Sequence, residues 1–456
     1  MPDQAQRNEA GTLLSTLKDD LEAQKLDQAQ LEASLAKLKI LGRDASNVSD
    51  IYDEDGVKVL GSYAFGDHPP SVHQEAMRCI ANALLLLPQT RSFALQAHLD
   101  WQSTDALRTA DVDEEFLLSR ILFLLTLDPT IDLKTLISEH DLAKSIVKHL
   151  TRHAEEVEKA KGQINQPAAM ALQETLKLLF SATSAQTDQL SEFNPAVVEV
   201  LRLLNDMPIP SPPLQPPINL LVNALANMEF DEDAMARTLG IESGVEKLIT
   251  ILEQAIAKHP IAELDIVGVP LLTVLRKINE KGSPELRKTL KARLLPDDKE
   301  RDQPLGKSGS LPSKLLQLTT SSGLLKLTEA ISGLMFELSD KDANEYVKNV
   351  GYGYAAGYLM THDIPVPESA KKTQQSGESS GSVPINPITG QRIDMEPEIE
   401  LPKMTREEKE REAERLFVLF ERLKTTGVVD VKNPVQQAME EGRIEELSDS
   451  DTDASD

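Results

Sequence analysis

The chain has 456 residues, with 48 Lys and Arg against 74 Asp and Glu, which gives a formal net charge of −26. It is 40% hydrophobic but only 4% aromatic, and it contains one Cys. This acidity argues against nucleic acid or an anionic membrane surface as the main partner, and a single Cys excludes an internal disulfide. The polar N-terminus shows no signal-peptide core, and no apolar run approaches the ~18 residues of a membrane span. We therefore expect a cytoplasmic protein that does not insert into membranes.

Apolar residues recur at helical spacing along the first 360 residues or so. The groups are Leu14, Leu17 and Leu21; Leu31, Leu35 and Leu38; Leu172, Leu176, Leu179 and Phe180; and Val245, Leu248, Ile249, Leu252 and Ile256. They belong to roughly a dozen to sixteen short helices, most of which are polar on one side. A compact bundle of that many helices would need several that are apolar all round. The pattern therefore predicts an all-α solenoid of stacked helices over residues 1–362.

Two of these helices carry an Asn within an apolar stretch, at Asn82 and Asn223. In armadillo-type stacks, such Asn residues lie along the groove and bond the backbone of a bound segment. The structural alternative is that each Asn satisfies a neighbouring carbonyl inside the solenoid, because buried polar groups are normally paired. The residues by themselves leave both interpretations open.

Changes in composition mark the connections and the end of the folded array. Six prolines in residues 208–217 predict an extended connection between two helices. Residues 296–313 are polar and predict a long exposed loop. Residues 368–390 are rich in Ser, Gly, Gln and Lys, which predicts a flexible linker over 363–400 that contains the element Asn386-Pro387-Ile388-Thr389-Gly390. A separate docking helix is expected over 401–425, followed by an acidic disordered tail over 426–456.

Short segments that look like catalytic or cofactor-binding motifs lack the neighbouring residues or the secondary structure that such sites need. Gly306-Lys307-Ser308 lacks the earlier Gly and the preceding strand of a phosphate-binding loop. The glycines of residues 351–357 follow a helical segment and predict a tight helix–helix junction instead of a dinucleotide site. His149 and His153 are four residues apart on one helix, but no third ligand lies nearby in sequence. We therefore expect no covalent catalysis, no metal and no cofactor.

Three C-terminal motifs, in this order, resemble those of the synembryn family. They are the glycine-rich stretch 351–357, the element Asn386-Pro387-Ile388-Thr389-Gly390, and the segment Met404-Thr405-Arg406-Glu407-Glu408-Lys409 with the apolar residues after it. Shorter stretches at 39–44, 78–82, 120–127 and 218–223 are also similar, so the resemblance runs from about residue 36 to the end. Residues 425–438 look like the fungal branch. Members of this family are cytosolic exchange factors and folding chaperones for the α subunits of heterotrimeric G proteins (Gα).

The resemblance implies a fold and a binding surface. The fold would be an armadillo/HEAT-type right-handed superhelix with a flexible tail, whose concave groove takes the C-terminal helix of Gα. Lys39 and Arg43 would meet the carboxyl end of that helix, and Asn82 and Asn223 would bond its last turn. Where the family has Phe-Asn, this chain has Phe180-Ser181, so one groove contact is shortened or lost.

The resemblance also assigns roles to the C-terminal region. The docking helix would brace the Gα nucleotide domain through Leu416, Phe417, Phe420 and Leu423. Ser448 and Ser450 each have an Asp three residues later and are candidates for an acid-directed kinase, although a plain solubilising tail explains the same acidity.

The expected partner is thus a Gα subunit that is GDP-bound, nucleotide-free or nascent. Through it, a monomeric chain would also reach the cell cortex and the periphery of the plasma membrane. The alternative function is that of a non-catalytic helical-repeat adaptor or scaffold without effect on bound nucleotide.

Overall fold

The computed structural model describes residues 4–230, 241–367, 385–386 and 388–396, and the single residues 405, 411 and 415. The chain divides into two compact units, Met1–Met395 and Glu396–Asp456, and the helices named below all belong to the first unit. Within the described residues the regular structure is helical, apart from one antiparallel bridge between Ile385 and Arg392. No helix among them is both long enough and apolar enough to cross a membrane.

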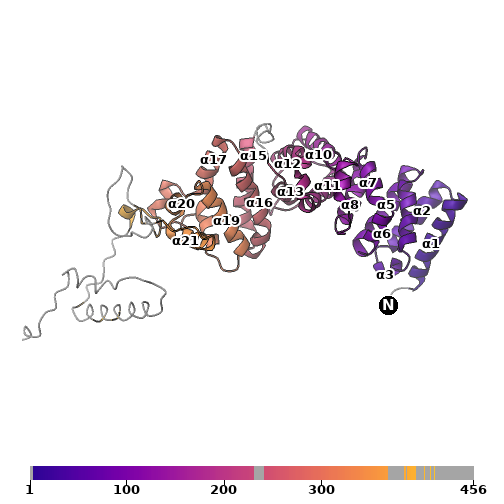
Figure 1. Ribbon diagram of the computed structural model, residues 1–456, viewed down its shortest axis with the longest axis horizontal. Coiled ribbons are helices and arrows are strands. Elements are labelled where there is room, and N and C mark those ends of the chain that lie inside the picture. Colours follow the sequence, from indigo (N-terminus) through magenta and orange to yellow (C-terminus); the bar gives the residue numbers. More distant parts are fainter. Residues whose placement is uncertain are drawn as a thin grey trace, which may run out of the picture. The chain divides into compact units, whose positions relative to one another are not determined.

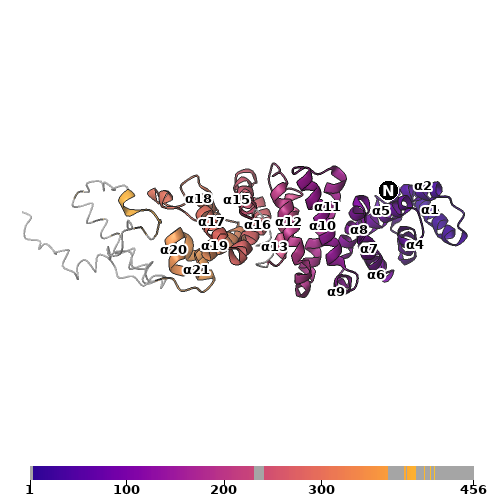
Figure 2. The same cartoon turned by 90° about the horizontal axis from the view of Figure 1, so that it is seen from above.

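A first row of helices runs through this unit, and each helix packs against the next one in the row. In Figures 1 and 2 these helices follow one another in chain order. The row consists of α2 (Gln28–Leu41), α5 (Pro70–Leu86), α8 (Val112–Leu125), α11 (Gln166–Ala185), α13 (Ile218–Asn227), α16 (Ile261–Lys281) and α19 (Leu325–Leu338).

A second row packs against the first and is also continuous from helix to helix. It consists of α4 (Glu54–Phe65), α6 (Thr90–Gln96), α7 (Leu99–Leu107), α10 (Leu142–Lys159), α12 (Asn194–Asp206), α15 (Ile241–Lys258) and α17 (Pro284–Leu294). The remaining α-helices of the described residues are α1 (Gln4–Ala23), α3 (Ala45–Val48), α9 (Leu133–Ser138), α18 (Leu311–Thr319), α20 (Ala343–Val350) and α21 (Tyr352–Thr361). Two stacked rows with contacts between sequence neighbours make a helical-repeat solenoid. The predicted fold class, all-α and of the armadillo/HEAT type, is confirmed.

Side chains cap the starts of several helices. Asp27 accepts a hydrogen bond from the Gln30 N–H while the Gln30 side chain accepts one from the Asp27 N–H, which closes a capping box on α2. Asp111 and Glu114 do the same for α8. These bonds satisfy N–H groups that have no partner inside the helix, so both row helices begin at residues that the sequence specifies.

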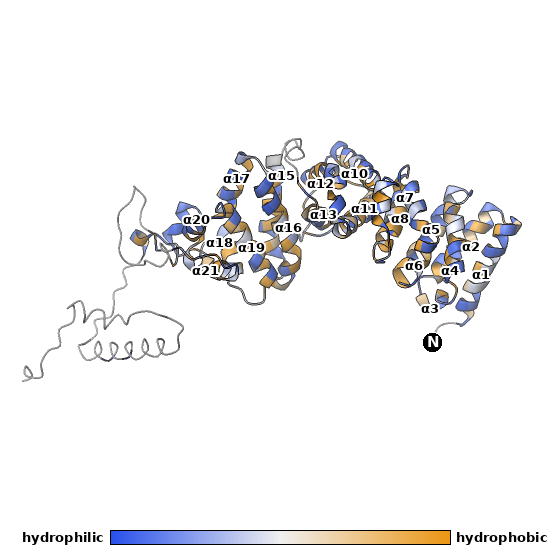
Figure 3. Cartoon of the chain, in the orientation of Figure 1, coloured by the Kyte–Doolittle hydropathy of each residue, from blue (hydrophilic) through white to orange (hydrophobic). Residues whose placement is uncertain are grey.

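The core is built mainly from the leucines with helical spacing. Leu31, Leu35 and Leu38 of α2 are buried, as are Leu172, Leu176 and Leu179 of α11. Figure 3 shows apolar and polar residues on different sides of the helices. One residue of the predicted apolar groups departs from this pattern, because the Phe180 side chain is 40% exposed.

The connections differ in how well the sequence predicted them. The proline-rich residues 208–217 do connect two helices, α12 and α13. Gly351, at φ +81°, joins α20 to α21, as expected of a tight junction. The expectation of an exposed loop over 296–313 is wrong for its middle, where Arg301 and Leu305 are buried. The reason is that residues 388–392, much later in the chain, lie on top of this loop.

Candidate partner-binding surface

Lys39, Asn82 and Asn223, three of the four predicted groove residues, lie on helices of the first row. Lys39 is in the last turn of α2, Asn82 is near the end of α5, and Asn223 is in the middle of α13. Arg43, the fourth, follows α2 directly after the capping residue Gly42. Lys39 and Asn82 are neighbours, because α2 packs against α5 and Asn82 Nδ2 lies 3.4 Å from the Lys39 carbonyl.

The two predicted cationic side chains, Lys39 and Arg43, differ in whether they already form an ion pair. The Lys39 ammonium pairs with Glu75 Oε2 at 2.6 Å, and the other oxygen of Glu75 accepts a bond from Arg78 at 2.7 Å. Arg43 is exposed, and its side chain makes no hydrogen bond or ion pair with any residue that the structure describes. Arg43 is therefore the cation available to an anionic partner group, whereas Lys39 would have to share or leave Glu75.

Asn82 and Asn223 also differ in whether their side-chain amides are hydrogen-bonded within the chain. The Asn82 side-chain amide donates to the Lys39 carbonyl on α2 at 3.4 Å, so the structural alternative applies to Asn82, although this bond is long. Asn223 is half-buried, and its amide has no hydrogen-bond partner in the described part of the chain. Its donors and acceptor are free to bond another molecule.

Asn223 is the middle member of a ladder of asparagines, whose other two members were not among the predicted groove residues. Asn219, Asn223 and Asn227 are spaced at i, i+4 and i+8, which places them along one face of α13. Asn219 Oδ1 is buried without a hydrogen-bond partner. Asn227 donates to Ser184 Oγ at 2.5 Å and to the Phe180 carbonyl at 3.4 Å. The four-residue spacing was visible in the sequence and would have been enough to find the ladder.

This asparagine ladder lines a hollow of about 530 Å³ between α11, α13 and α16. The other walls are mainly apolar and include Phe180, Leu214, Ile266, Val267, Val269 and Pro270. Phe180 and Ile266 are 40% and 73% exposed, so both present apolar surface at the hollow. A hollow with apolar walls and a row of amides is suited to a peptide segment that presents both apolar side chains and free backbone groups.

Ser181 stands where the related family has Asn. Its hydroxyl lies 2.5 Å from Thr126 Oγ1, so it bonds the end of the neighbouring helix α8 within the solenoid. A hydroxyl held in this way does not reach outward as an Asn amide would. The expected shortening of this groove contact has a geometric basis, and the contact itself stays a prediction.

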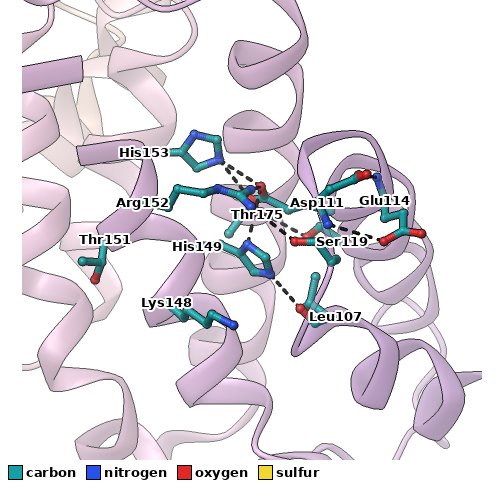
Figure 4. A network of polar contacts seen from close by, with 12 residues as sticks. Leu107, Asp111, Glu114, Ser119, Lys148, His149, Thr151, Arg152, His153 and Thr175 are labelled. Carbon is teal, nitrogen blue, oxygen red and sulfur yellow. Dashed lines mark hydrogen bonds and ion pairs between the residues drawn. The ribbon is translucent and has the colours of Figure 1, made fainter. Parts of the chain in front are cut away.

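His149 and His153, whose spacing raised the question of a metal pair, serve a buried carboxylate instead. The Glu115 side chain is fully buried between α8, α10 and α11. His153 Nε2 lies 3.1 and 3.0 Å from its two oxygens, and Thr175 donates to Oε1 at 2.6 Å. Arg152 pairs with Oε2 from the same turn of α10. Figure 4 shows His149, Arg152, His153 and Thr175 converging on this point.

The electrostatics of this cluster follow from its burial. Burial by itself would raise the pKa of Glu115, but hydrogen bonds from His153 and Thr175 and the charges of both histidines hold it below its ordinary value. Burial lowers the pKa of His149, whose Nε2 lies 2.7 Å from the Leu107 carbonyl. Among the described residues, no group of three His, Cys, Asp or Glu is placed to hold a metal ion. The cluster is therefore a structural element that joins three helices.

The other predicted site residues belong to the C-terminal region. Leu416, Phe417, Phe420 and Leu423 of the docking helix, and the phosphorylation candidates Ser448 and Ser450, lie outside the described residues. Their assigned roles stay predictions.

Comparison with known proteins gives a consistent family assignment. The family model described as guanine nucleotide exchange factor synembryn matches residues 34–443. The "Chaperone Ric-8A" of Macaca fascicularis is 26% identical over 482 aligned positions, which cover 94% of this chain and 87% of that relative. The "Synembryn-like chaperone" of Schizosaccharomyces pombe is 32% identical over 171 positions, 35% of this chain and 32% of that relative. An engineered protein of known crystal structure aligns with a TM-score of 0.43 and 17% identity, over 59% of this chain and 98% of its own.

Proposed function

The chain belongs to the synembryn family of guanine nucleotide exchange factors, and from this premise we propose that it is an exchange factor and folding chaperone for G-protein α subunits. The names of its relatives, which include "Chaperone Ric-8A" and "Synembryn-like chaperone", support the chaperone part. The partner would be a Gα subunit in its GDP-bound, nucleotide-free or nascent form. We place the encounter in the cytoplasm and at the membrane periphery where Gα resides.

The first row of helices would hold the C-terminal helix of Gα. The observation that carries this proposal is the asparagine ladder of α13, with unpartnered amide groups beside an apolar hollow. The last turn of any helix has carbonyls without partners and a partial negative charge. The amide of Asn223 can donate to such carbonyls, and exposed Phe180 can pack against the apolar side of the same helix. Arg43 lies further along the row, because α5, α8 and α11 stand between α2 and α13. Its free cation would therefore meet the carboxyl end of a chain that continues along the row beyond that last turn.

Exchange would then follow from differential affinity. Gα holds GDP partly through a loop attached to the base of its C-terminal helix, so withdrawing that helix loosens the nucleotide site. A partner shifts this equilibrium only by as much as it prefers the open state, and a change from 1:99 to 99:1 needs about 5.5 kcal/mol. Two contact regions would share that requirement. One is the surface of the first row with Arg43, Phe180 and Asn223, which we call the row surface. The other is the docking helix with Leu416, Phe417, Phe420 and Leu423.

The decisive experiment is the rate of GDP release from purified Gα with and without this chain. An exchange factor increases the rate in proportion to its concentration, whereas the alternative, a helical-repeat adaptor, leaves the rate unchanged even where it binds Gα. An unchanged rate would therefore exclude the exchange activity.

A matched pair of variants tests the row surface. We expect Asn223→Ala to weaken binding of a Gα C-terminal peptide by about two- to tenfold, the equivalent of one hydrogen bond. The thermal midpoint should stay unchanged, because Asn223 makes no hydrogen bond within the described part of the chain. Asn205→Ala, at the end of α12 in the second row, is the control and should bind the peptide normally. Affinities are measured by fluorescence anisotropy. Equal affinities for both variants would show that the peptide does not bind at Asn223.

A further inference from the structure

Residues 385, 386 and 388–395, which we call the anchor, form a compact turn bound to the last repeats. Asn386 Oδ1 accepts bonds from the N–H groups of Ile388 and Thr389, at 2.9 and 3.3 Å. The Gly390 N–H closes the turn on the Asn386 carbonyl at 2.8 Å, and the Asn386 N–H donates to the Gln391 carbonyl at 2.7 Å. The described residues of the Asn-Pro-Ile-Thr-Gly element thus form a self-supporting turn, although the composition of the surrounding segment predicted a flexible linker.

Backbone hydrogen bonds hold the anchor to the solenoid on two sides. On one side the Leu305 N–H donates to the Thr389 carbonyl at 3.0 Å, and the Arg392 N–H to the Arg301 carbonyl at 2.8 Å. On the other, the Gly353 N–H donates to the Ile388 carbonyl at 3.2 Å. The anchor therefore bridges the loop before α18 and the start of α21.

Buried Arg301 makes this attachment specific. Its guanidinium donates to the Gly390 carbonyl at 3.0 Å and to the carbonyls of Lys348 and Asn349 at 2.8 and 3.2 Å. A buried cation needs such acceptors, and one of them belongs to the anchor. The Gln391 side chain, also buried, donates to the Asp302 carbonyl at 3.2 Å. Detaching the anchor would leave several of these polar groups without partners.

We propose that the anchor fixes the point from which the C-terminal segment, residues 396–456, acts on Gα. This proposal rests on the proposed function. Within the expected docking-helix range 401–425, Thr405 and Glu408 have the spacing of a capping box, which predicts a start at Thr405. With the anchor attached, Thr405 lies ten positions after Met395. Without it, the free span runs from Pro367, which is 38 positions before Thr405. Effective concentration falls roughly as the −3/2 power of linker length, so detachment would lower it by about sevenfold.

Gly390→Val is the variant that tests this proposal. Gly390 has φ +68°, and an added Cβ would lie 2.3 Å from Leu305 Cδ1, so a branched side chain there is strained and clashes with the loop. Gly357→Ala is the matched control, because Gly357 lies in α21 with no atom within 4 Å of an added Cβ. Should Gly390→Val fail to fold, Asn386→Ala with Gln391→Ala removes the turn acceptor and the bond to Asp302 while leaving the solenoid residues intact.

Three measurements on the full-length chain decide the outcome. We expect Gly390→Val to lose hydrogen-exchange protection at the amides of Leu305, Gly390 and Arg392, to bind a Gα C-terminal peptide normally, and to accelerate GDP release up to about sevenfold less than wild type. Gly357→Ala should match wild type in all three. Lost protection with full GDP release would overturn the anchor's role. If protection survives Gly390→Val, the same comparison is made with Asn386→Ala and Gln391→Ala. A wild-type chain without effect on GDP release would instead overturn the proposed function, and this role with it.

Discussion

At the scale of single residues, burial decides whether a polar side chain supports the fold or remains available to a partner. Glu115 and Asn223 are both polar residues on first-row helices. Glu115 is fully buried and has partners on two neighbouring helices, whereas Asn223 is half-buried and has none among the described residues. Only a polar group without an internal partner, such as the Asn223 amide, can bond another protein without first breaking an internal interaction.

His149 provides a prediction about pH at this scale. Burial holds its pKa in the folded chain below the ordinary value of 6.5. Below pH 6.5 the unfolded chain therefore binds more protons than the folded one, and the free energy of unfolding decreases as the pH falls. The pKa of Glu115 is also held below its ordinary value of 4.5. The free energy of unfolding therefore decreases further as the pH falls below 4.5.

The test compares wild type with His149→Gln, which keeps a donor for the Leu107 carbonyl but does not titrate. Urea unfolding at pH 7.5, 6.5 and 5.5 should show a smaller loss of stability for the variant than for wild type, although the variant is less stable at pH 7.5. Identical pH dependence in both chains would show that His149 does not contribute.

At the scale of elements, the solenoid depends on contacts between successive helices, and the Glu115 cluster is one such contact. Glu115 comes from α8, its His and Arg partners come from α10, and Thr175 comes from α11. Repeat proteins derive their stability largely from interfaces between neighbouring helices. Loss of an interaction in this cluster should therefore destabilise mainly those three helices.

Removing the carboxylate should destabilise this part of the stack. We expect Glu115→Ala to cost about 3 kcal/mol, the low end for breaking a buried pair, because Arg152 is partly exposed and can be rehydrated. Hydrogen exchange should increase in α8, α10 and α11 more than in α19. Glu114→Ala, at the neighbouring half-buried position, is the control and should cost about 1 kcal/mol through the capping box. A uniform loss of protection along the chain would contradict a local role.

The elements also show which sequence predictions failed and why. Phe180 continues the apolar spacing of α11, yet its side chain lines the hollow beside α13. Helical periodicity indicates which side of a helix is apolar but not whether another helix covers all of it. Residues 296–313 read as an exposed loop because their composition is polar, and residues 388–392, some 80 positions later, bury their middle.

At the scale of the whole chain, the division into Met1–Met395 and Glu396–Asp456 separates two roles that the proposed mechanism needs. The first unit contains the row surface and the anchor. The second contains the predicted docking helix and the whole of the predicted acidic tail, residues 426–456. Removing part of the second unit should therefore leave the first unit folded.

Deletion of residues 401–456 tests this separation. We expect the shortened chain to bind a Gα C-terminal peptide with unchanged affinity, because Arg43, Phe180 and Asn223 remain in place. Its acceleration of GDP release should be clearly weaker, because the second contact with Gα is lost. Peptide affinity can be measured by calorimetry, and GDP release by the loss of a fluorescent analogue. Unchanged GDP release in the shortened chain would show that the docking helix is dispensable.

The sequence by itself determined the class of the fold and the family of the protein. Helical spacing and scarce aromatics are local properties, so the stacked helices could be predicted without a structure. The motifs that resemble the synembryn family are likewise contiguous in the chain. The helical pattern placed Asn82 and Asn223 on helices, and the structure assigns those helices to one row.

The tertiary structure alone decided which of these groups are free and which segments lie together. It shows Lys39 paired with Glu75, Arg43 unpaired within the described residues, and Asn223 in a ladder beside a hollow. It also brings Gly390 next to Leu305 and Arg301, although more than 80 residues separate them in the chain. The physical reason is that a side chain's partners depend on long-range packing, whereas the charge of −26, the helical pattern and the motifs are local or additive properties of the sequence.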